Sequence, residues 1–508
     1  MEANEKELRQ RPIFLIKPET ERENFVMAPP LGILYLGGAL EKQGYRVRLI
    51  HERFNPVNEK KIVDEILAAD PLFVGISTFT GPSLLPSLRL TRKIKKQSAI
   101  PVIWGGLHST MLPEQTLQEE DIDLAVRGEG EETVVRLADL IASGGIDAQG
   151  LAAIPGVAYR NGGRIRVNEM PPFIQDLDAF SPAWHLLESE RYLSEGKYIY
   201  TALGSKMSGL KIATVMTSRG CPGRCGYCFN QFINKRTFRT HSVEFVVEHI
   251  NQLKKNHGVT GIIFEDDCLF TDRQRALAIL RWLGAPWSSS IRADYLARWG
   301  EDFVRELKEL GCAEIRIGAE SGSQETLDIM QKDIRREHIF RSVELCRRHD
   351  INVMMGFMIG VPGERWSETL KTFDIIDEME KQNVTVAAGP AFYFPYPGTP
   401  MFDEAVKGGF IPPASIKDWA IPWGPSQPLP RYADPRARYV GYYRSMAMRQ
   451  VTGSLRFPLL VKILQRLARW RWRRRFFSFP LDYLVPRFFL LILRQLGLRR
   501  MLAGIYDE

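Results

Sequence analysis

The chain has 508 residues, of which 44% are apolar and 25% are charged, a composition typical of folded globular proteins and unlike that of disordered chains. This length predicts two or three domains. The formal net charge of +8 is uneven, because residues 1–450 hold 56 basic and 57 acidic side chains while residues 451–508 hold 12 and 3.

All six cysteines lie between residues 221 and 346, and residues 1–220 contain none. The first residues hold no apolar run long enough for a signal peptide, since residues 1–11 are charged and 12–16 are too few. We therefore expect a cytoplasmic protein, in which a framework of disulfides would be out of place.

Residues 12–145 alternate between strand-like and helical patterns. The helical stretches include 31–43, 60–69 and 85–96, and the strand-like runs are 12–17, 46–51, 73–77, 101–105 and 124–127. This alternation predicts an α/β fold with a doubly wound, Rossmann-like parallel sheet, whose ligands bind beyond the carboxyl ends of the strands.

Small and hydroxyl side chains follow three of these strands, in the segments 77–80, 105–110 and 127–133. They would let a large planar ligand approach the backbone. The candidate ligand-binding residues are Thr78, Gly105, Gly106, His108, Gly128 and Glu129. His108 is either a pocket-lining residue or a loop histidine with a structural hydrogen bond.

The segments 29–36, 104–108 and 126–131 resemble the cobalamin-binding domain that is fused to many radical enzymes. The chain departs from other cobalamin domains in one respect. It lacks the Asp-x-His-x-x-Gly motif that supplies an axial histidine to cobalt, and the loop 17–28 has no histidine. The resemblance therefore implies a cobalamin bound without a protein imidazole on cobalt.

Cys221, Cys225 and Cys228 form a C-x3-C-x2-C motif directly after an apolar, strand-like segment. A four-iron cluster normally takes four cysteine ligands, so three cysteines on one loop leave one iron open. The glycines at 220, 223 and 226 suit a loop that must wrap closely around a cluster.

Zinc is a weaker interpretation, because a structural zinc site needs a fourth Cys or His nearby and His241 has no partner at finger spacing. Cys268, Cys312 and Cys346 are isolated in the sequence and are interpreted as buried small hydrophobes. The motif resembles that of the radical S-adenosylmethionine (SAM) superfamily. There a [4Fe–4S] cluster binds SAM at the open iron and cleaves it to a 5′-deoxyadenosyl radical.

From about residue 210 the chain again alternates strand and helix. The helical stretches are predicted at 243–256, 271–283, 300–310, 324–330, 336–349 and 366–381. The strands are predicted at 211–217, 261–266, 289–293, 314–317, 353–359 and 384–394. Six such units match the partial (β/α)6 barrel of the superfamily, a relative of the eightfold barrel whose chemistry lies at the carboxyl strand ends.

The same resemblance assigns cofactor contacts to residues at those strand ends. Glu265 and Asp266 match acids that hold the SAM amino group, and Arg292 offers a bidentate partner for a carboxylate. Tyr227 matches an aromatic that packs on adenine. The remaining assigned residues contact the ribose, the methionyl part or the adenine side: Glu320, Ser321, Gly360 and Gly363.

The tail combines short apolar runs at 455–467 and 488–502 with the basic, aromatic stretch 469–475. Neither run is long enough to span a membrane. A basic amphipathic segment of this kind favours peripheral contact with a membrane surface. RNA binding and helices packed on the barrel with arginines in solvent are the alternatives.

Together the motifs identify the chain as similar to the cobalamin-binding radical SAM enzymes over about residues 12–450. The predicted domains are a cobalamin-binding domain at 1–150, a linker at 151–209, a radical SAM domain at 210–410 and a helical region with a basic tail at 411–508.

The family resemblance implies modification of an unactivated carbon of an apolar or lipid substrate, with C-methylation as the expected reaction. Oxidative ring closure or rearrangement on a tetrapyrrole or lipid is the alternative. A flavodoxin or ferredoxin is the expected reductant.

Two further rivals are a tRNA-modifying enzyme and a non-enzymatic cobalamin sensor. A tRNA methylthiotransferase would carry cysteines for a second cluster in its first domain, and residues 1–220 have none. Nucleic acid is therefore not expected as a partner. A sensor would not require a complete cluster loop.

Overall fold

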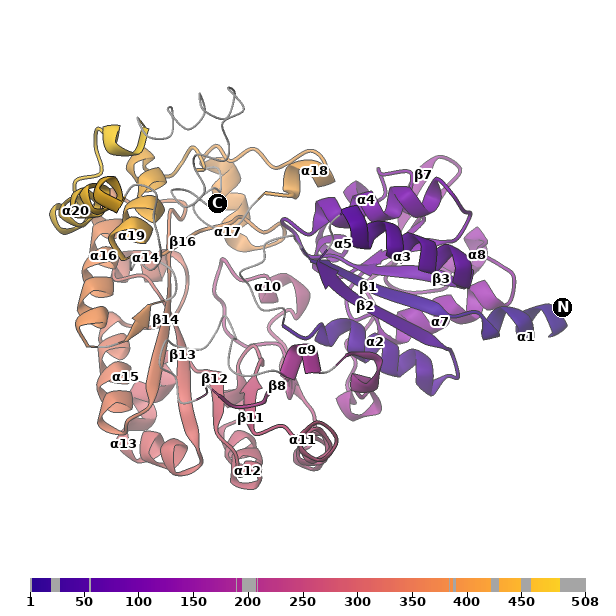
Figure 1. Ribbon diagram of the computed structural model, residues 1–508, viewed down its shortest axis with the longest axis horizontal. Coiled ribbons are helices and arrows are strands. Elements are labelled where there is room, and N and C mark those ends of the chain that lie inside the picture. The colour runs from indigo at the N-terminus through magenta and orange to yellow at the C-terminus, as the bar shows by residue number, and fades with distance from the viewer. Residues whose placement is uncertain are drawn as a thin grey trace.

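Figure 1 shows the computed structural model of the chain, in which two α/β domains lie side by side. Helices α19 (Val440–Met448) and α20 (Pro458–Arg474) lie on the side of the second domain that faces away from the first domain. The structure describes residues 2–19, 28–53, 56–188, 190–193, 207, 209–382, 384–386, 390–421, 429–448 and 458–484.

The first sheet has seven strands in the order β2-β1-β3-β4-β5-β6-β7. β1 to β5 run parallel, whereas β6 and β7 are antiparallel to their neighbours. The strands are β1 (Ile13–Glu19), β2 (Val47–Arg53), β3 (Phe73–Ser77), β4 (Val102–Gly105), β5 (Leu124–Val126), β6 (Val157–Asn161) and β7 (Arg164–Val167). The order 2-1-3-4-5 confirms a doubly wound sheet, with its ligand-binding switch point between β1 and β3.

Helices cover both faces of this sheet. Along β1, Ile13 and Leu15 join the apolar core on one face, while Phe14 and Ile16 join the core on the other, as the two-residue period of a strand requires. The helices are α1 (Glu2–Gln10), α2 (Leu31–Lys42), α3 (Pro56–Ala69), α4 (Leu84–Lys95), α5 (Leu107–Met111), α6 (Pro113–Thr116), α7 (Glu131–Ala142) and α8 (Ala148–Ala152).

The sheet of the first domain continues past residue 150. β6 pairs with β5, and β7 pairs with β6, within the segment 151–209 that the sequence predicts as a linker. Val157 and Ala158 are fully buried, so burial of this hairpin explains why it joins the sheet. The other predicted domain boundaries stay predictions.

The second sheet follows the chain in the order β15-β14-β13-β12-β11-β8, and β16 also pairs with β14. All of its pairs are parallel, which confirms the predicted open barrel of βα units. The strands are β8 (Ile212–Val215), β11 (Gly261–Phe264), β12 (Trp287–Ser290), β13 (Cys312–Glu320), β14 (Asn352–Ile359), β15 (Thr385–Val386) and β16 (Ala391–Phe392).

Several predicted strands have other bounds in the structure. The third strand ends at Ser290 rather than residue 293, because Arg292 is the N-cap of the next helix. The predicted run 384–394 contains two short strands, β15 and β16.

The helices of the second domain follow the predicted pattern closely. Gly300 has a φ of +74° and interrupts α13. The helix predicted at 300–310 corresponds to the part of α13 that follows this break. The helices are α10 (Asn230–Ile233), α11 (Val243–His257), α12 (Arg273–Leu283), α13 (Ala293–Glu309), α14 (Gln324–Ile329), α15 (Arg336–Arg348) and α16 (Trp366–Lys381).

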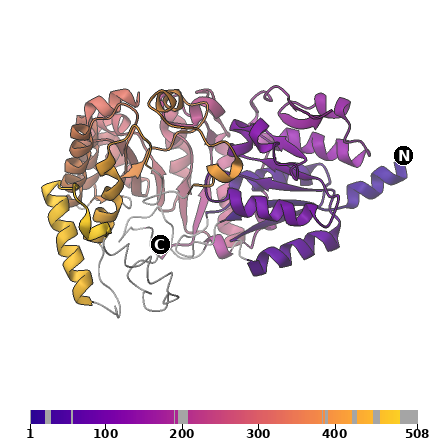
Figure 2. The same cartoon turned by 90° about the horizontal axis from the view of Figure 1, so that it is seen from above.

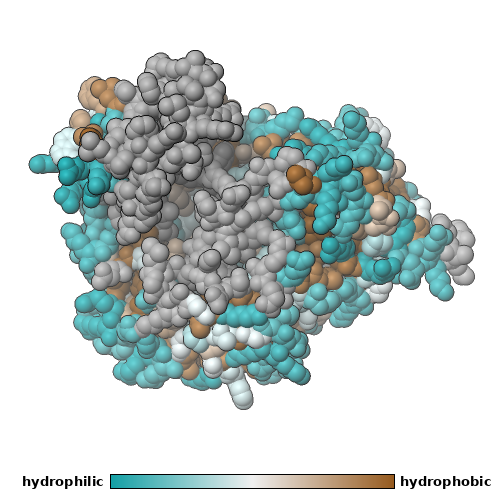
Figure 3. Space-filling model, viewed as in Figure 1, coloured by the Kyte–Doolittle hydropathy of each residue, from teal (hydrophilic) through white to brown (hydrophobic). Residues whose placement is uncertain are grey.

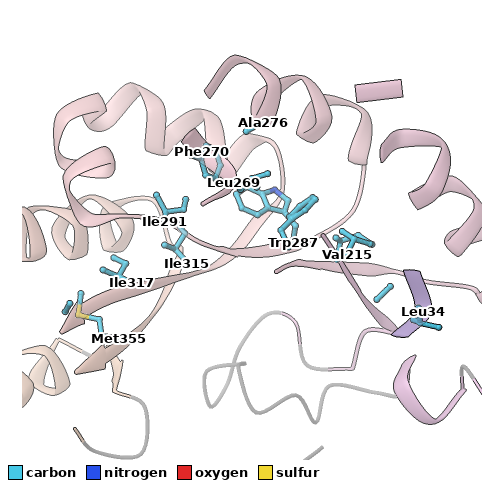
Figure 4. Close-up of a cluster of buried hydrophobic side chains, with 14 of the residues drawn as sticks. Leu34, Val215, Leu269, Phe270, Ala276, Trp287, Ile291, Ile315, Ile317 and Met355 are labelled. Atoms are coloured by element: carbon cyan, nitrogen blue, oxygen red, sulfur yellow. The ribbon is translucent and has the colours of Figure 1, made fainter. Parts of the chain in front are cut away.

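One apolar core runs through both domains. It includes Leu15 and Leu34 of the first domain together with Val215 and Trp287 of the second. Figure 4 shows Trp287 beside Leu269 and Phe270, with Val215 and Leu34 farther along the same cluster. Because side chains of both domains pack in this one core, the two sheets are held in a fixed relative position.

α19 and α20 pack at the outer edge of the second domain, as Figures 1 and 2 show. No helix in the described ranges is long and apolar enough to cross a membrane. α17 (Pro400–Lys407) and α18 (Ile416–Trp419) precede α19, and Ile416 and Trp419 of α18 join the apolar core of the first domain.

Candidate cofactor site

The cluster loop follows β9 (Ser218–Arg219), a two-residue strand that pairs with β10 (Arg239–Thr240). Gly220 has a φ of +88°, and a Cβ there would lie 2.1 Å from the carbonyl oxygen of Thr237. A larger residue would therefore displace the first turn of the loop.

The thiols of Cys221 and Cys225 flank Gly223. A Cβ on Gly223 would lie 3.3 Å from the Cys221 sulfur and 3.9 Å from the Cys225 sulfur. The backbone N–H of Gly223 donates to the Cys221 sulfur at 3.4 Å. The glycine leaves space beside these two thiols, as a loop that wraps closely around a cluster requires.

Cys268 lies against the loop. It is buried, and a hydrogen bond from its thiol lowers the pKa of Cys221 below the ordinary value of a thiol. This favours the thiolate, the form that ligates metals. The sequence predicts Cys268 to be a buried small hydrophobe, and its burial is confirmed. The sequence does not predict its contact with Cys221, because the two residues are 47 positions apart in the chain. Cys312 and Cys346 are buried, as predicted.

Tyr227, Glu320 and Lys332 form a buried hydrogen-bonded triad beside the cluster loop. The Tyr227 hydroxyl donates to Glu320 at 3.0 Å, and the Lys332 ammonium lies 3.0 Å from both oxygens. Glu320 holds a φ of +61°, a conformation that costs energy and often marks a functional position. Burial and the nearby Glu320 raise the pKa of Tyr227 well above its usual range.

Arg292 closes the same side of the loop. Its guanidinium pairs with Asp294 at 2.8 Å and donates to the Lys332 carbonyl at 3.0 Å. A Cβ on Gly223 would lie 3.5 Å from its Nη1. The structure thus brings the predicted residues Tyr227, Glu320 and Arg292 together and adds Lys332, which lies after α14, outside the predicted strand ends.

The three acids that follow β11 point to different partners. Glu265 pairs with Arg316 at 2.6 Å. Asp266 is buried and accepts hydrogen bonds from the Thr217 N–H and hydroxyl and from the Ser218 hydroxyl, while burial raises its pKa to about 6. Asp267, the last of these acids, accepts from the Gly220 N–H at 2.9 Å. Asp266 and Asp267 therefore both support the backbone that leads into the cluster loop.

Ser321 is fully buried, and its hydroxyl bonds to Thr372 at 3.0 Å and accepts from the Ser323 N–H. These partners indicate that Ser321 shapes the turn after β13. Gly360 and Gly363 adopt positive φ values in the loop after β14. The Gly360 N–H donates to Glu364 at 2.6 Å, and burial raises the pKa of Glu364 to about 7.

A cavity of about 310 Å³ opens where the two sheets meet. It lies at the switch point of the first sheet, because Leu15 of β1 and Phe73 of β3 line it together with Ile103. The predicted residues Gly105, Gly106, Gly128 and Glu129 also line it, and the second domain contributes Met216, Arg219, Ile233, Asn234 and Asp267.

The glycines make the cavity accessible to a bulky ligand. Gly106 has a φ of +91°, and a Cβ there would lie 2.5 Å from the Thr78 carbonyl oxygen. The apolar interior and the glycine rim fit part of a cobalamin, since both allow a large group to approach the backbone. No histidine is among the described residues that line it.

Thr78 and His108 lie outside the lining of this cavity. The Thr78 hydroxyl donates to the Gly105 carbonyl at 2.9 Å and so supports the glycine loop. The His108 Nδ1 lies 3.1 Å from the Thr80 hydroxyl, and burial lowers the histidine pKa to about 4. These contacts favour the structural interpretation of His108 over a pocket-lining one.

A buried ion network joins the two domains beside the cavity. Arg219 pairs with Glu129 at 3.0 Å and with Glu131 at 2.6 Å, and Arg239 pairs with Glu129 at 2.7 Å. Arg219 also stacks on Tyr35, with its guanidinium carbon 5.1 Å from the ring centre. Arg219 stands two residues before Cys221, so the network links the glycine loop directly to the cluster loop.

Comparison with known proteins agrees with this architecture. The model of the radical SAM superfamily matches residues 215–376, and that of the B12 binding domain matches residues 26–138. An uncharacterized methyltransferase of Pyrococcus horikoshii is 30% identical over 415 residues, which cover 78% of this chain and 84% of that protein.

Two further proteins are similar. The anaerobic magnesium-protoporphyrin IX monomethyl ester cyclase of Rubrivivax gelatinosus is 28% identical, over 74% of this chain and 66% of that protein. The solved structure of the radical SAM methyltransferase TsrM from Kitasatospora setae, with cobalamin and a [4Fe–4S] cluster bound, superposes with a TM-score of 0.61 at 20% identity. That match covers 78% of this chain and 75% of TsrM.

An open parallel barrel with a three-cysteine loop defines a radical SAM enzyme. The chain belongs to the cobalamin-dependent radical SAM methyltransferase family, which also holds cyclases. Its cofactors are a [4Fe–4S] cluster, SAM and cobalamin.

Proposed function

We propose that the protein methylates an unactivated carbon of an apolar substrate. The observation that carries this proposal is the shared edge of the cluster loop and the cavity. Asp267 lines the cavity and accepts the hydrogen bond of the Gly220 N–H at 2.9 Å. Two cofactor sites in contact suit a reaction in which a substrate radical receives a group from a neighbouring cofactor.

In this proposal Cys221, Cys225 and Cys228 hold the cluster. Lys332, Glu320 and Tyr227 orient SAM against it, with Arg292 available to a carboxylate. When bound, the cluster and SAM supply a 5′-deoxyadenosyl radical, and cobalamin supplies the methyl group. The protein contributes binding, orientation and exclusion of water.

The glycine loops at 105–106 and 128–130 would hold the cobalamin, without a histidine from the described cavity lining. The support is the cavity lining, in which glycines and apolar side chains replace histidine. Arg219, Glu129 and Glu131 fix the distance between this site and the cluster loop through their buried ion pairs.

The apolar substrate, peripheral contact with a membrane and a flavodoxin- or ferredoxin-type reductant belong to the same proposal. Support for an apolar substrate comes from the exposed apolar side chains of the carboxyl-terminal region, which include Trp470, Phe479 and Leu481. Oxidative ring closure is the second candidate, since a related protein carries the name of a cyclase.

Product analysis separates the two reactions. The anaerobically reconstituted enzyme, with reductant, would be incubated with lipid and tetrapyrrole extracts and SAM that carries a deuterated methyl group. A product heavier by one labelled methyl group supports methylation. A product that has lost hydrogen and gained no label would contradict methylation and support ring closure.

A further inference from the structure

α20 packs on the protein with one face. Trp472 and Phe477 contact the ring of Phe373 on α16, with centroid separations of 5.0 and 5.7 Å. The Trp472 indole donates to Asp377 at 2.7 Å. This inner face explains the burial of the helix, while the side chains on its outer face are exposed.

The arginines of this region divide between the two faces. Arg471 pairs with Asp482 at 2.7 Å, and Arg475 pairs with Asp374 and Asp377 at 2.8 and 2.7 Å. The outward basic residues are exposed, and within the described part of the chain no carboxylate pairs with them: Lys462, Arg466, Arg469, Arg473 and Arg474.

On the outer face, basic and apolar side chains form two neighbouring stripes. At 100° per residue, Lys462, Arg466, Arg469 and Arg473 fall within one arc of about 60°. Ile463, Leu467 and Trp470 occupy the adjacent arc, and their exposed fractions are 46%, 39% and 50%.

The apolar stripe continues beyond the helix. Phe476 lies edge-on to Trp470 at 5.8 Å, and Phe479 and Leu481 are 78% and 65% exposed. Figure 3 shows hydrophobic and hydrophilic side chains next to each other at the corner where α20 and residues 476–484 lie.

We propose that this outer face of α20, with residues 476–484, docks on the surface of an anionic lipid bilayer. Exposed cations match anionic headgroups, and a neighbouring row of exposed Leu, Ile, Trp and Phe side chains suits shallow insertion at the boundary with the acyl chains. A nucleic acid would use the cations and the aromatic rings, but the aliphatic side chains Ile463, Leu467 and Leu481 cannot stack on bases. The inference deepens the proposed apolar substrate by naming the surface from which the enzyme would reach it.

The full-length reconstituted protein would be sedimented with vesicles of phosphatidylcholine alone or mixed with phosphatidylglycerol. We expect binding to the anionic vesicles, and loss of most of it between about 0.05 and 1 M salt, where the Debye length shrinks to roughly 3 Å. Each basic residue near the surface contributes about a fivefold factor in binding.

Two variants and two controls of equal size identify the face. Binding should fall at least about a hundredfold in the basic variant, which carries Lys462→Gln, Arg466→Gln, Arg469→Gln and Arg473→Gln. The apolar variant, Ile463→Ser with Leu467→Ser and Trp470→Ser, should also bind weakly. The controls should bind as the natural chain does, since they change exposed residues elsewhere: Lys255→Gln, Arg305→Gln, Arg347→Gln and Lys381→Gln in one, and Val57→Ser, Trp282→Ser and Ile411→Ser in the other.

Circular dichroism and SAM cleavage, measured on every variant, report folding and the cofactor site separately from docking. Absence of binding to anionic vesicles at low salt would overturn the inference while leaving the proposed reaction intact. An equal loss in the controls would overturn it as well. Binding of tRNA in preference to anionic vesicles at the same salt would also contradict it and identify the face as a nucleic-acid surface.

Discussion

The Arg219 guanidinium binds the Glu131 carboxylate at 2.6 Å across the boundary between the two domains. Glu131 begins α7, directly after the glycine loop that lines the cavity, and Arg219 ends the strand that leads into the cluster loop. Both side chains are less than a tenth exposed. The buried pair therefore holds the glycine loop and the cluster loop in a fixed position relative to each other.

Removing one charge of this pair should destabilise the protein strongly. Glu131→Gln leaves Arg219 with one fewer carboxylate in a buried site, and breaking a buried pair in this way costs about 3–5 kcal/mol. Chemical denaturation would measure the loss. The matched control is Asp302→Asn, which removes an exposed pair with Arg305 and should cost under about 1 kcal/mol. Equal effects of the two substitutions would show that the network has no special role.

Lys332 should control SAM binding. Lys332→Gln removes the buried cation that holds Glu320 and Tyr227 at 3.0 Å, and charged hydrogen bonds of this kind contribute roughly 1.5–3 kcal/mol. We expect SAM affinity, measured by calorimetry, to fall about ten- to a hundredfold. Lys308→Gln, at a surface pair with Asp350, is the control. An unchanged affinity in the Lys332 variant would remove Lys332 from the site.

The pH dependence of stability should report on Glu364. Burial raises its folded pKa from 4.5 to about 7, so the folded state binds more protons than the unfolded state between these values. Stability therefore falls as pH rises through this window, by up to about 3 kcal/mol from this group. The Glu364→Gln variant has no carboxyl group to ionise, so it does not lose this stability. Its free energy of unfolding minus that of the natural chain should therefore increase from pH 5 to pH 8 in denaturation experiments. Parallel curves for the two proteins would contradict the burial of an ionisable Glu364.

The sequence predicts the parts of the site that depend on local pattern. Glycines and small side chains after apolar strands identify the loops at Gly105 and Gly128, and cysteine spacing identifies the cluster loop. Both kinds of signal lie within a few residues, and the parallel arrangement of the strands then brings the loops to one edge.

Contacts between distant segments could not be predicted in this way. Asp266 and Asp267 are adjacent, yet Asp266 turns inward to Thr217 and Ser218 while Asp267 lines the cavity. Their difference depends on the packing of β11 against β8. Lys332 and Cys268 likewise meet the cluster loop only through the tertiary fold, and their sequence neighbourhoods carry no signal for it.

Electron paramagnetic resonance should show how cobalt is bound. Since histidine is absent from the described lining of the cavity, the cob(II)alamin form of the protein should show no superhyperfine splitting from a protein nitrogen, and labelling the histidines of the protein with nitrogen-15 should leave its spectrum unchanged. A cobalamin-loaded protein with an axial histidine provides the reference spectrum. A spectrum that changes when the histidines carry nitrogen-15, or failure to take up cobalamin, would contradict the proposed site.

Reductive cleavage of SAM tests the central claim most directly, that the three-cysteine loop is the catalytic centre. The anaerobically reconstituted protein should contain about four irons and four sulfides, as one cubane requires, and should release 5′-deoxyadenosine from SAM in the presence of a reductant. The variant with Cys221→Ala, Cys225→Ala and Cys228→Ala should lose both the iron and the product, whereas Cys312→Ala should keep both. Release of 5′-deoxyadenosine by the triple variant at the natural rate would contradict the claim.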